Sequence, residues 1–206
     1  GIGEQRTAPA HHVHSKLMAW LALDRAMRIA EARGERHARR RSRLRRWELA
    51  RSALGADVHR RGYDEERCTY TATYGSAELD AATLVLPLIG LEPADGPRVR
   101  GTVDAVLGGL RAGGPLLYRY PPATDGLEGP EGAFLPCSFW AVQALAVSGR
   151  TADAETLMDE LLSMAGPLGL WAEEADPSTG EQLGNYPQAL THSALVQAIL
   201  ALSLGE

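Results

Sequence analysis

The sequence predicts an all-α fold, and three observations support this prediction. Apolar residues recur at spacings of three, four and seven positions, as on one face of a helix, along most of the 206 residues. About seven such segments follow one another, joined alternately by short turns and by long loops. No segment shows the pattern that buried parallel strands require. The chain is 45% hydrophobic and holds only 2 Cys, which excludes a disordered chain and a disulfide scaffold.

Two long helices are expected first. Residues 16–32 place Leu17 and Trp20 on one apolar stripe, and Gly34 follows as a helix-terminating residue. A second helix is expected over residues 35–54, where charged and apolar residues alternate at helical spacing.

An irregular stretch and two further helices come next. Residues 63–74 are rich in Thr and Tyr and are expected to be extended or irregular. Ser76 is suited to an N-cap, with acidic residues in the turn after it, and predicts a helix that runs to about residue 88. Gly and Pro then break the chain before a helix over residues 99–110. Residues 111–130 form a long loop rich in Gly and Pro, and its length favours a functional role.

The C-terminal part predicts three more helices. Residues 134–147 are apolar nearly all round, as expected of a helix that is buried on every side. Residues 151–165 are amphipathic, and residues 166–185 form a second long loop. Pro187 suits the first turn of a last helix that ends near residue 204. Because long loops follow alternate helices, they are expected on one face, where helical toroids build their sites.

The charges are unevenly distributed along the chain. Residues 1–67 hold 16 basic and 9 acidic residues, a formal charge of +7, whereas residues 68–206 hold 5 and 17, a charge of −12. An Arg-rich run over residues 36–46, followed by Trp47, could bind phosphate or an acidic protein. A solvated outer helix face is the other interpretation, and we favour it because no groove-reading motif accompanies the run. We therefore expect no nucleic-acid partner.

Two polar clusters could carry chemistry. His11, His12 and His14 are too close in sequence to share a helix face, and no Cys or carboxylate lies at ligand spacing, so we expect no metal site. Glu173 follows Trp171 in a loop, which is typical of a general base or sugar ligand beside an aromatic wall. An exposed acidic loop would have the same sequence, so the residues alone leave both interpretations open.

Five segments together resemble a known family. In their order and spacing they are similar to glycoside hydrolase family 15, the group of glucoamylases, glucodextranases and bacterial trehalases. The segments are GIGEQR (1–6), HSKLMAWLALDRA (14–26), YGSAELDAATLVLPLIG (74–90), YRYPPATDGLEGPEGAFLPCSFW (118–140) and WAEEADPSTGEQLGNYPQALTHSAL (171–195).

The resemblance implies an (α/α)6 barrel that hydrolyses α-glucosidic bonds with inversion, using one carboxylic acid and one carboxylate base. It assigns Glu4 as the acid and Glu173 as the base. Arg119 matches an arginine that binds the terminal glucose, Glu174 falls where a polar residue contacts sugar hydroxyls, and Arg6 is a further candidate for the same subsite. The implied substrate is a disaccharide or oligosaccharide with α-linked glucose, and the reaction requires no cofactor.

The chain also departs from the family pattern. Gly3 stands where the family has Trp, and Thr7 stands where it has Gly. The family barrel has about twelve helices behind a β-sandwich domain, whereas about seven are predicted here. We therefore expect residues 1–206 to be the C-terminal portion of one catalytic domain, inactive by itself. A non-catalytic binding module that uses the Arg-rich helix 36–46 is the alternative.

Two expectations concern the surroundings of the protein. The longest apolar stretch, residues 133–147, is shorter than the roughly 20 residues that a bilayer requires, so we expect no membrane partner. We expect a cytoplasmic location, which the low cysteine content permits.

Overall fold

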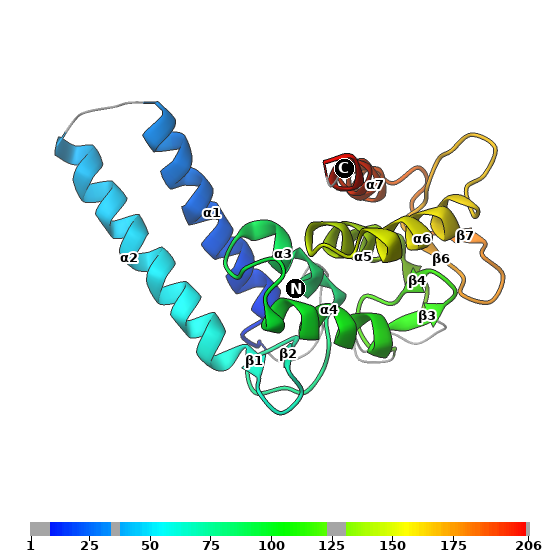
Figure 1. Ribbon diagram of the computed structural model, residues 1–206, viewed down its shortest axis with the longest axis horizontal. Helices are drawn as coiled ribbons and strands as arrows, with labels where there is room; N and C mark the ends of the chain where they lie inside the picture. Colours follow the sequence, from blue (N-terminus) through cyan, green and yellow to red (C-terminus); the bar gives the residue numbers. More distant parts are fainter. Residues whose placement is uncertain (1–8, 34–37, 123–130, 205–206) are drawn as a thin grey trace.

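The computed structural model describes residues 9–33, 38–122 and 131–204 and confirms the all-α prediction (Figure 1). The described chain contains seven α-helices, one 3-10 helix and three small antiparallel sheets. The α-helices are α1 (Val13–Ala32), α2 (Ala38–Arg61), α3 (Leu86–Ile89), α4 (Pro97–Gly109), α5 (Leu135–Val147), α6 (Thr151–Leu162) and α7 (Ala189–Ser203), and the 3-10 helix η1 (Ala81–Val85) leads directly into α3.

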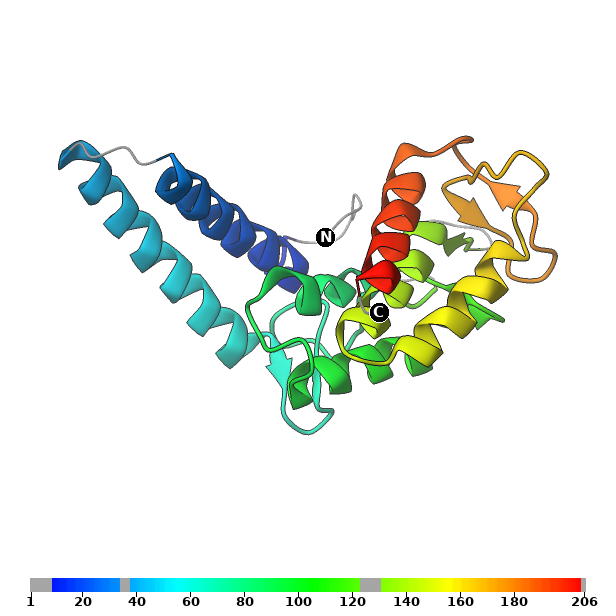
Figure 2. The same cartoon turned by 45° about the horizontal axis from the view of Figure 1, so that its top comes forward.

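The helices form an inner and an outer row. α1, the η1–α3 segment, α5 and α7 lie side by side in the inner row, and each of α2, α4 and α6 packs behind this row. Figure 2 shows the resulting open arc, with the α1–α2 hairpin forming one arm and α5, α6 and α7 forming the other. Alternation of inner and outer helices is the arrangement of a toroid, and here the arc does not close.

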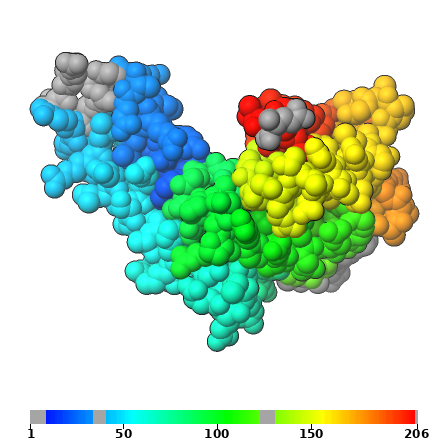
Figure 3. Space-filling view, in the orientation of Figure 1, coloured from blue at the N-terminus to red at the C-terminus, as the bar shows by residue number. Residues whose placement is uncertain are grey.

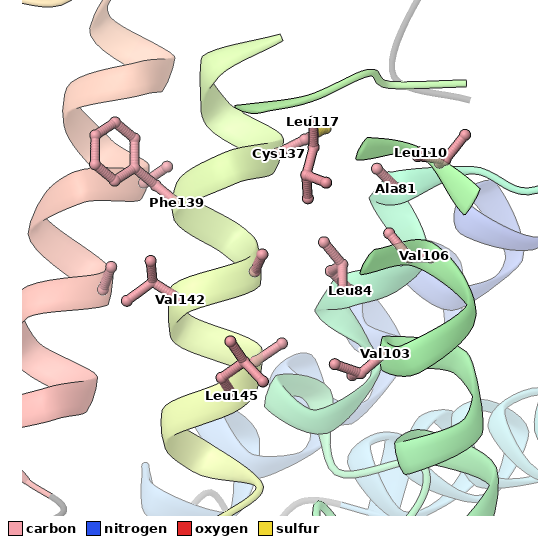
Figure 4. Close-up of a cluster of buried hydrophobic side chains, with 14 of the residues drawn as sticks. Ala81, Leu84, Val103, Val106, Leu110, Leu117, Cys137, Phe139, Val142 and Leu145 are labelled. Atoms are coloured by element: carbon pink, nitrogen blue, oxygen red, sulfur yellow. The ribbon is translucent and has the colours of Figure 1, made fainter. Parts of the chain in front are cut away.

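Helix α5 is the centre of the core. Ten of its 13 residues are buried, which confirms the expectation of a helix covered on every side. Phe139 and Val142 lie toward α7, whereas Cys137 and Leu145 lie toward η1 and α4 (Figure 4). Each fully buried side chain of this size contributes about 1.5–3 kcal/mol to stability.

The α1–α2 arm is held together around a buried carboxylate. Asp24 on α1 accepts hydrogen bonds from Arg51 on α2 at 2.6 Å and from Arg28 at 2.8 Å, and it also pairs with Arg25. Burial acts to raise the pKa of Asp24, but the hydrogen bonds from Arg51 and Arg25 outweigh it and hold that pKa below its usual range. The arm is therefore joined by charge as well as by apolar packing.

The sheets lie within the segments expected to be irregular or loop. β1 (Tyr63–Asp64) pairs with β2 (Thr69–Tyr70), and β3 (Arg111–Gly113) pairs with β4 (Leu116–Leu117). The third sheet has the order β5–β6–β7, in which β5 (Ala133–Phe134) and β7 (Gln182–Leu183) flank β6 (Glu174–Ala175). All three are antiparallel, and the third one carries Glu174 at the start of β6, directly after Glu173.

Two predicted helix starts were wrong. Ser76 does not begin a helix, because its hydroxyl accepts from the Glu78 N–H in a local turn, and the helical segment starts at η1, where the Asp80 side chain accepts from the Ala82 N–H. Pro187 precedes the last helix, whose N-cap is Gln188. In both places a neighbouring side chain offers the better cap.

The second helix ends later than expected, at Arg61 rather than near residue 54. Gly55 lies inside α2, where an added Cβ would come 3.2 Å from the Trp20 ring and from Leu91. The glycine therefore permits close packing of α2 on α1 instead of ending the helix. Nearer the start of α2, the basic side chains of the Arg-rich run that the structure describes are exposed, namely Arg41, Arg43, Arg45 and Arg46.

No helix within residues 9–33, 38–122 and 131–204 is long and apolar enough to cross a membrane.

Candidate active site

The N-terminal ends of three inner-row helices are each hydrogen-bonded to the backbone of a residue that the sequence predicts for the site. The Ala81 N–H at the start of η1 donates to the Arg119 carbonyl at 2.8 Å, and the Leu135 N–H at the start of α5 donates to the Glu173 carbonyl at 3.1 Å. Near the start of α7, the Gln188 N–H donates to the Trp171 carbonyl at 2.8 Å. Helix N-termini carry partial positive charge, so the surroundings of these three helix starts suit carboxylates.

Backbone and side-chain hydrogen bonds fix the segment that carries Glu173. Ala172 is held on both sides, because its N–H donates to the Gln182 side chain at 2.6 Å and its carbonyl accepts from the Thr191 hydroxyl at 2.8 Å. The Glu173 N–H donates to the Asn185 carbonyl at 3.0 Å. Glu173 therefore stands on a rigid connection between the starts of α5 and α7.

The Glu173 carboxylate is partly exposed and points toward the turn that follows β7. Its Oε2 accepts a hydrogen bond from the Asn185 side-chain amide at 2.9 Å. Gly184 lies against the same side chain, and a Cβ at that position would come 3.2 Å from both Cβ and Oε2 of Glu173. Sequence reasoning singled out Glu173 but missed Asn185, although both lie in the segment that carried the family resemblance.

Glu174 lies on β6 directly opposite Phe134 of β5. Its side chain covers Gly132, where an added Cβ would come 2.5 Å from Glu174 Oε2. A side chain at position 132 would displace the carboxylate, so the small residue fixes where Glu174 can lie.

Arg119 stands beside this sheet with its guanidinium against two aromatic rings. Its Cζ lies 4.3 Å from the centre of the Tyr120 ring and 5.2 Å from that of Phe134, and its Nη2 donates to the Tyr120 hydroxyl. Its buried Nε has no hydrogen-bond partner among the described residues. Phe134 is also the cross-strand partner of Glu174, so Arg119 and Glu174 lie at the same sheet, and Glu173 immediately precedes Glu174 in the chain.

Asp80 is a buried carboxylate that the sequence did not single out as a site residue. It is 6% exposed, and burial raises its pKa, against the opposing effects of the hydrogen bond from the Ala82 N–H and the charge of Arg119. In the sequence it was interpreted only as one of the acidic residues in the first turn after Ser76.

Trp171 is 1% exposed and forms an edge-to-face pair with Phe139, with ring centres 5.2 Å apart. Its ring has no free face for a sugar in the described chain, and it anchors the Glu173 segment to α5. Glu4 and Arg6 lie outside the described residues. Among the described residues, no group of three His, Cys, Asp or Glu side chains could hold a metal ion.

A hollow of about 540 Å³ opens on the inner face of the arc, between α1 and α7 (Figure 3). Its lining is mainly apolar and includes residues of every inner-row element, α1, η1, α3, α5 and α7. The polar residues of the lining are His14, Gln143, Ser193 and Gln197.

The family model for glycosyl hydrolases family 15 matches residues 1–166. Trehalase from Mycolicibacterium smegmatis is 45% identical over 201 residues, which are 97% of this chain and 29% of that trehalase. Trehalase from Thermoplasma acidophilum is 35% identical over 196 residues, which are 95% of this chain and 33% of that trehalase. The chain spans about a third or less of the length of these relatives.

Solved structures have the same arrangement of helices. A glycosidase in complex with glucose superposes with a TM-score of 0.77 at 18% identity, covering 97% of this chain and 54% of that one. A glucoamylase from Saccharomycopsis fibuligera gives a TM-score of 0.74 at 14% identity, covering 97% of this chain and 56% of that one. The two rows of helices are thus part of the (α/α)6 barrel of glucoamylases. Because the family model matches most of the chain and the trehalases align along nearly all of it, the chain belongs to glycosyl hydrolases family 15.

Proposed function

We propose that this chain supplies the catalytic base and one wall of the sugar site of an inverting glycoside hydrolase that acts on α-linked glucose. The fixed position of Glu173 carries the proposal, because its backbone joins the starts of α5 and α7 while its carboxylate stays partly exposed. The next residue, Glu174, lies opposite Phe134, whose ring contacts Arg119. The trehalases similar to this chain make trehalose the first substrate to test.

The proposed reaction uses two carboxyl groups on opposite sides of the scissile bond. Glu173 accepts a proton from a water molecule, whose oxygen forms a bond to the anomeric carbon. The bond from that carbon to the glycosidic oxygen breaks, and Glu4 gives its proton to the leaving oxygen. Hydrolysis of trehalose by this route releases one β-glucose from the attacked ring and one α-glucose from the leaving ring.

The neighbouring side chains suit the recognition of sugar hydroxyls. The Arg119 guanidinium offers only donors and the Glu174 carboxylate only acceptors, so together they match hydroxyl groups, which do both. The rings of Tyr120 and Phe134 hold the guanidinium in place. Trp171 supports the site from the core, in contact with Phe139.

The test is Glu173→Gln in a protein that carries the complete barrel. We expect kcat on trehalose to fall about 10²- to 10⁴-fold, the contribution typical of a general base, with trehalose binding retained because the amide keeps the shape of the side chain. Glu181→Gln is the matched control, since Glu181 is an exposed glutamate in the turn between β6 and β7.

Activity of Glu173→Gln within tenfold of wild type would place the base elsewhere. Anomeric analysis of the first product by NMR provides a second check. If only α-glucose is released at early times, inversion is ruled out.

A further inference from the structure

One residue contacts both the backbone and the side chain of Glu173. The Asn185 side-chain amide donates to Glu173 Oε2 at 2.9 Å, and the Asn185 backbone N–H lies 3.5 Å from the same oxygen. The Asn185 carbonyl accepts from the Glu173 N–H at 3.0 Å. These contacts join the end of β7 to the residue just before β6.

Gly184, the residue before Asn185, also lies against the Glu173 side chain. Gly184 has a φ of +74°, a left-handed conformation that favours glycine. Its Cα lies against the Glu173 side chain, so that an added Cβ would come 3.2 Å from Oε2. Gly184 and Asn185 together confine one oxygen of the carboxylate.

The other carboxylate oxygen of Glu173, Oε1, remains available to act as the base. Among the described residues, no hydrogen bond reaches Glu173 Oε1. Each carboxylate oxygen can accept two hydrogen bonds, and Oε2 already faces both the Asn185 amide at 2.9 Å and the Asn185 backbone N–H at 3.5 Å. Oε1 is therefore the better placed of the two oxygens to take a proton from water.

We propose that Asn185 is a positioning residue for the base, which ties down Glu173 Oε2 and directs Oε1 at the nucleophilic water. This inference rests on the proposed function of Glu173. A general base must lie within hydrogen-bond reach of its water, and a displacement of about 1 Å costs on the order of 10²-fold in rate. A fixed carboxylate keeps its oxygen at that position between turnovers.

Two substitutions separate this role from a merely structural one. Asn185→Ala removes the amide and leaves the backbone contacts. Asn185→Asp keeps the shape and the turn propensity of asparagine, but it places a second carboxylate next to Glu173 Oε2 and takes away the donor. A residue needed only for the turn would tolerate Asp, whereas a residue needed as a donor would not.

The kinetic test uses the protein with the complete barrel and trehalose as substrate. We expect Asn185→Ala to lower kcat about 10- to 100-fold with KM changed less than about threefold, and Asn185→Asp to lower kcat further. Thr179→Asp is the control, because it adds a carboxylate at an exposed position of the turn between β6 and β7. Thermal unfolding of each variant checks that the fold is intact.

The outcomes distinguish the two proposals. A wild-type protein that releases no glucose from α-glucosides overturns the proposed function. An active wild type whose Asn185→Ala and Asn185→Asp variants stay within threefold in kcat overturns the positioning role alone. An Asp variant as active as wild type beside an impaired Ala variant also contradicts it, since the structural role predicts that result.

A second measurement tests the hydrogen bond between Asn185 and Glu173 directly and does not depend on catalytic activity. Asn185 is the only asparagine of the 206 residues, so ¹⁵N-asparagine labelling of this chain gives a single side-chain amide pair by NMR. We expect Glu173→Ala to shift that pair and Glu181→Ala to leave it in place. If the pair does not respond to Glu173→Ala, the hydrogen bond that the proposal requires is absent.

Discussion

Glu173 and Glu174 are neighbours in the chain, but their surroundings give them different capabilities. The side chain of Glu173 meets the Gly184–Asn185 turn, whereas that of Glu174 covers Gly132. Successive side chains of an extended segment point to opposite sides, which separates the two carboxylates. One is held at a single oxygen and stays partly exposed, as a base requires, and the other lies over the strand that carries Phe134.

Single residues also mark the limit of what the sequence could predict for the site. Glu173, Glu174 and Arg119 were predicted, because they lie in segments whose residue types already resemble the family. Asp80 and Asn185 were not, because an acidic cap and a turn amide become site residues only when the fold brings Arg119 or Glu173 beside them. Trp171 was predicted to face a sugar, and the structure shows it buried against Phe139.

The buried His14 predicts a pH dependence of stability. It lines the hollow on the inner face and is 8% exposed, and burial is the main cause that lowers its pKa from 6.5 to about 4. Between pH 6.5 and about 4, His14 binds a proton in the unfolded chain but not in the folded chain. The free energy of unfolding therefore falls as the pH is lowered through this range. It changes no further from this group below pH 4. The full loss is about 3 kcal/mol.

Urea unfolding of wild type and His14→Gln at pH 7 and pH 4.5 measures this effect. We expect the variant to lose less stability than wild type over that window, because glutamine does not titrate. His11→Gln serves as the control, since His11 is exposed and stacks on Tyr74. Equal losses in wild type and His14→Gln would show that His14 is not the group responsible.

At the scale of the elements, the existence of each helix could be predicted and its limits could not. Apolar patterning together with caps and Gly/Pro breaks predicted the seven helices of the described chain, because burial of apolar surface is what stabilises a helix in a folded protein. The starts depended on which side chain reaches the first free N–H groups, and Asp80 does so where Ser76 was expected. The end of α2 depended on Gly55, which serves packing against Trp20 rather than termination.

Helix α5 is the element whose packing should matter most. Phe139 is fully buried between α5 and α7 and contacts the ring of Trp171. We expect Phe139→Ala to lower the free energy of unfolding by about 3–5 kcal/mol, because it leaves a cavity in addition to the lost apolar burial. Phe139→Leu should cost clearly less. Chemical denaturation measures both, and a loss below about 1 kcal/mol for the alanine variant would mean that α5 and α7 are not packed as described.

At the scale of the whole molecule, the described chain forms an arc with an unpartnered inner edge. Helix α7 packs on α5 by its small residues Thr191, Ala194 and Ala198, whereas Ile199 and Leu200 are 46% and 55% exposed. The hollow of about 540 Å³ is lined on α7 by Leu190, Ser193, Ala194 and Gln197. Apolar surface left in water costs about 25 cal/mol per Å², so this edge favours a covering partner.

Two independent counts support a proposal about the extent of the barrel. The expectation of an incomplete ring came from seven predicted helices against the family's twelve. The solved structures agree with that proportion, since the chain covers 54% and 56% of the two that were compared. We propose that helices outside these 206 residues close the ring over α1 and α7 and bring the remaining sugar contacts to Glu173 and Arg119.

This proposal predicts that the 206-residue chain alone releases no glucose from trehalose or maltose, and that the rest of a complete barrel, supplied as a separate chain, restores release. The exposed edge of α7 should then be the contact surface. Ile199→Lys is expected to weaken the restoration at least tenfold, because it places a charge where an apolar face must be covered. Leu162→Lys, at a 43% exposed position at the end of the outer helix α6, should leave it unchanged. Glucose release by the chain alone would show that the site is complete without the missing helices. Equal restoration by the two lysine variants would show that α7 is not the edge at which the ring closes.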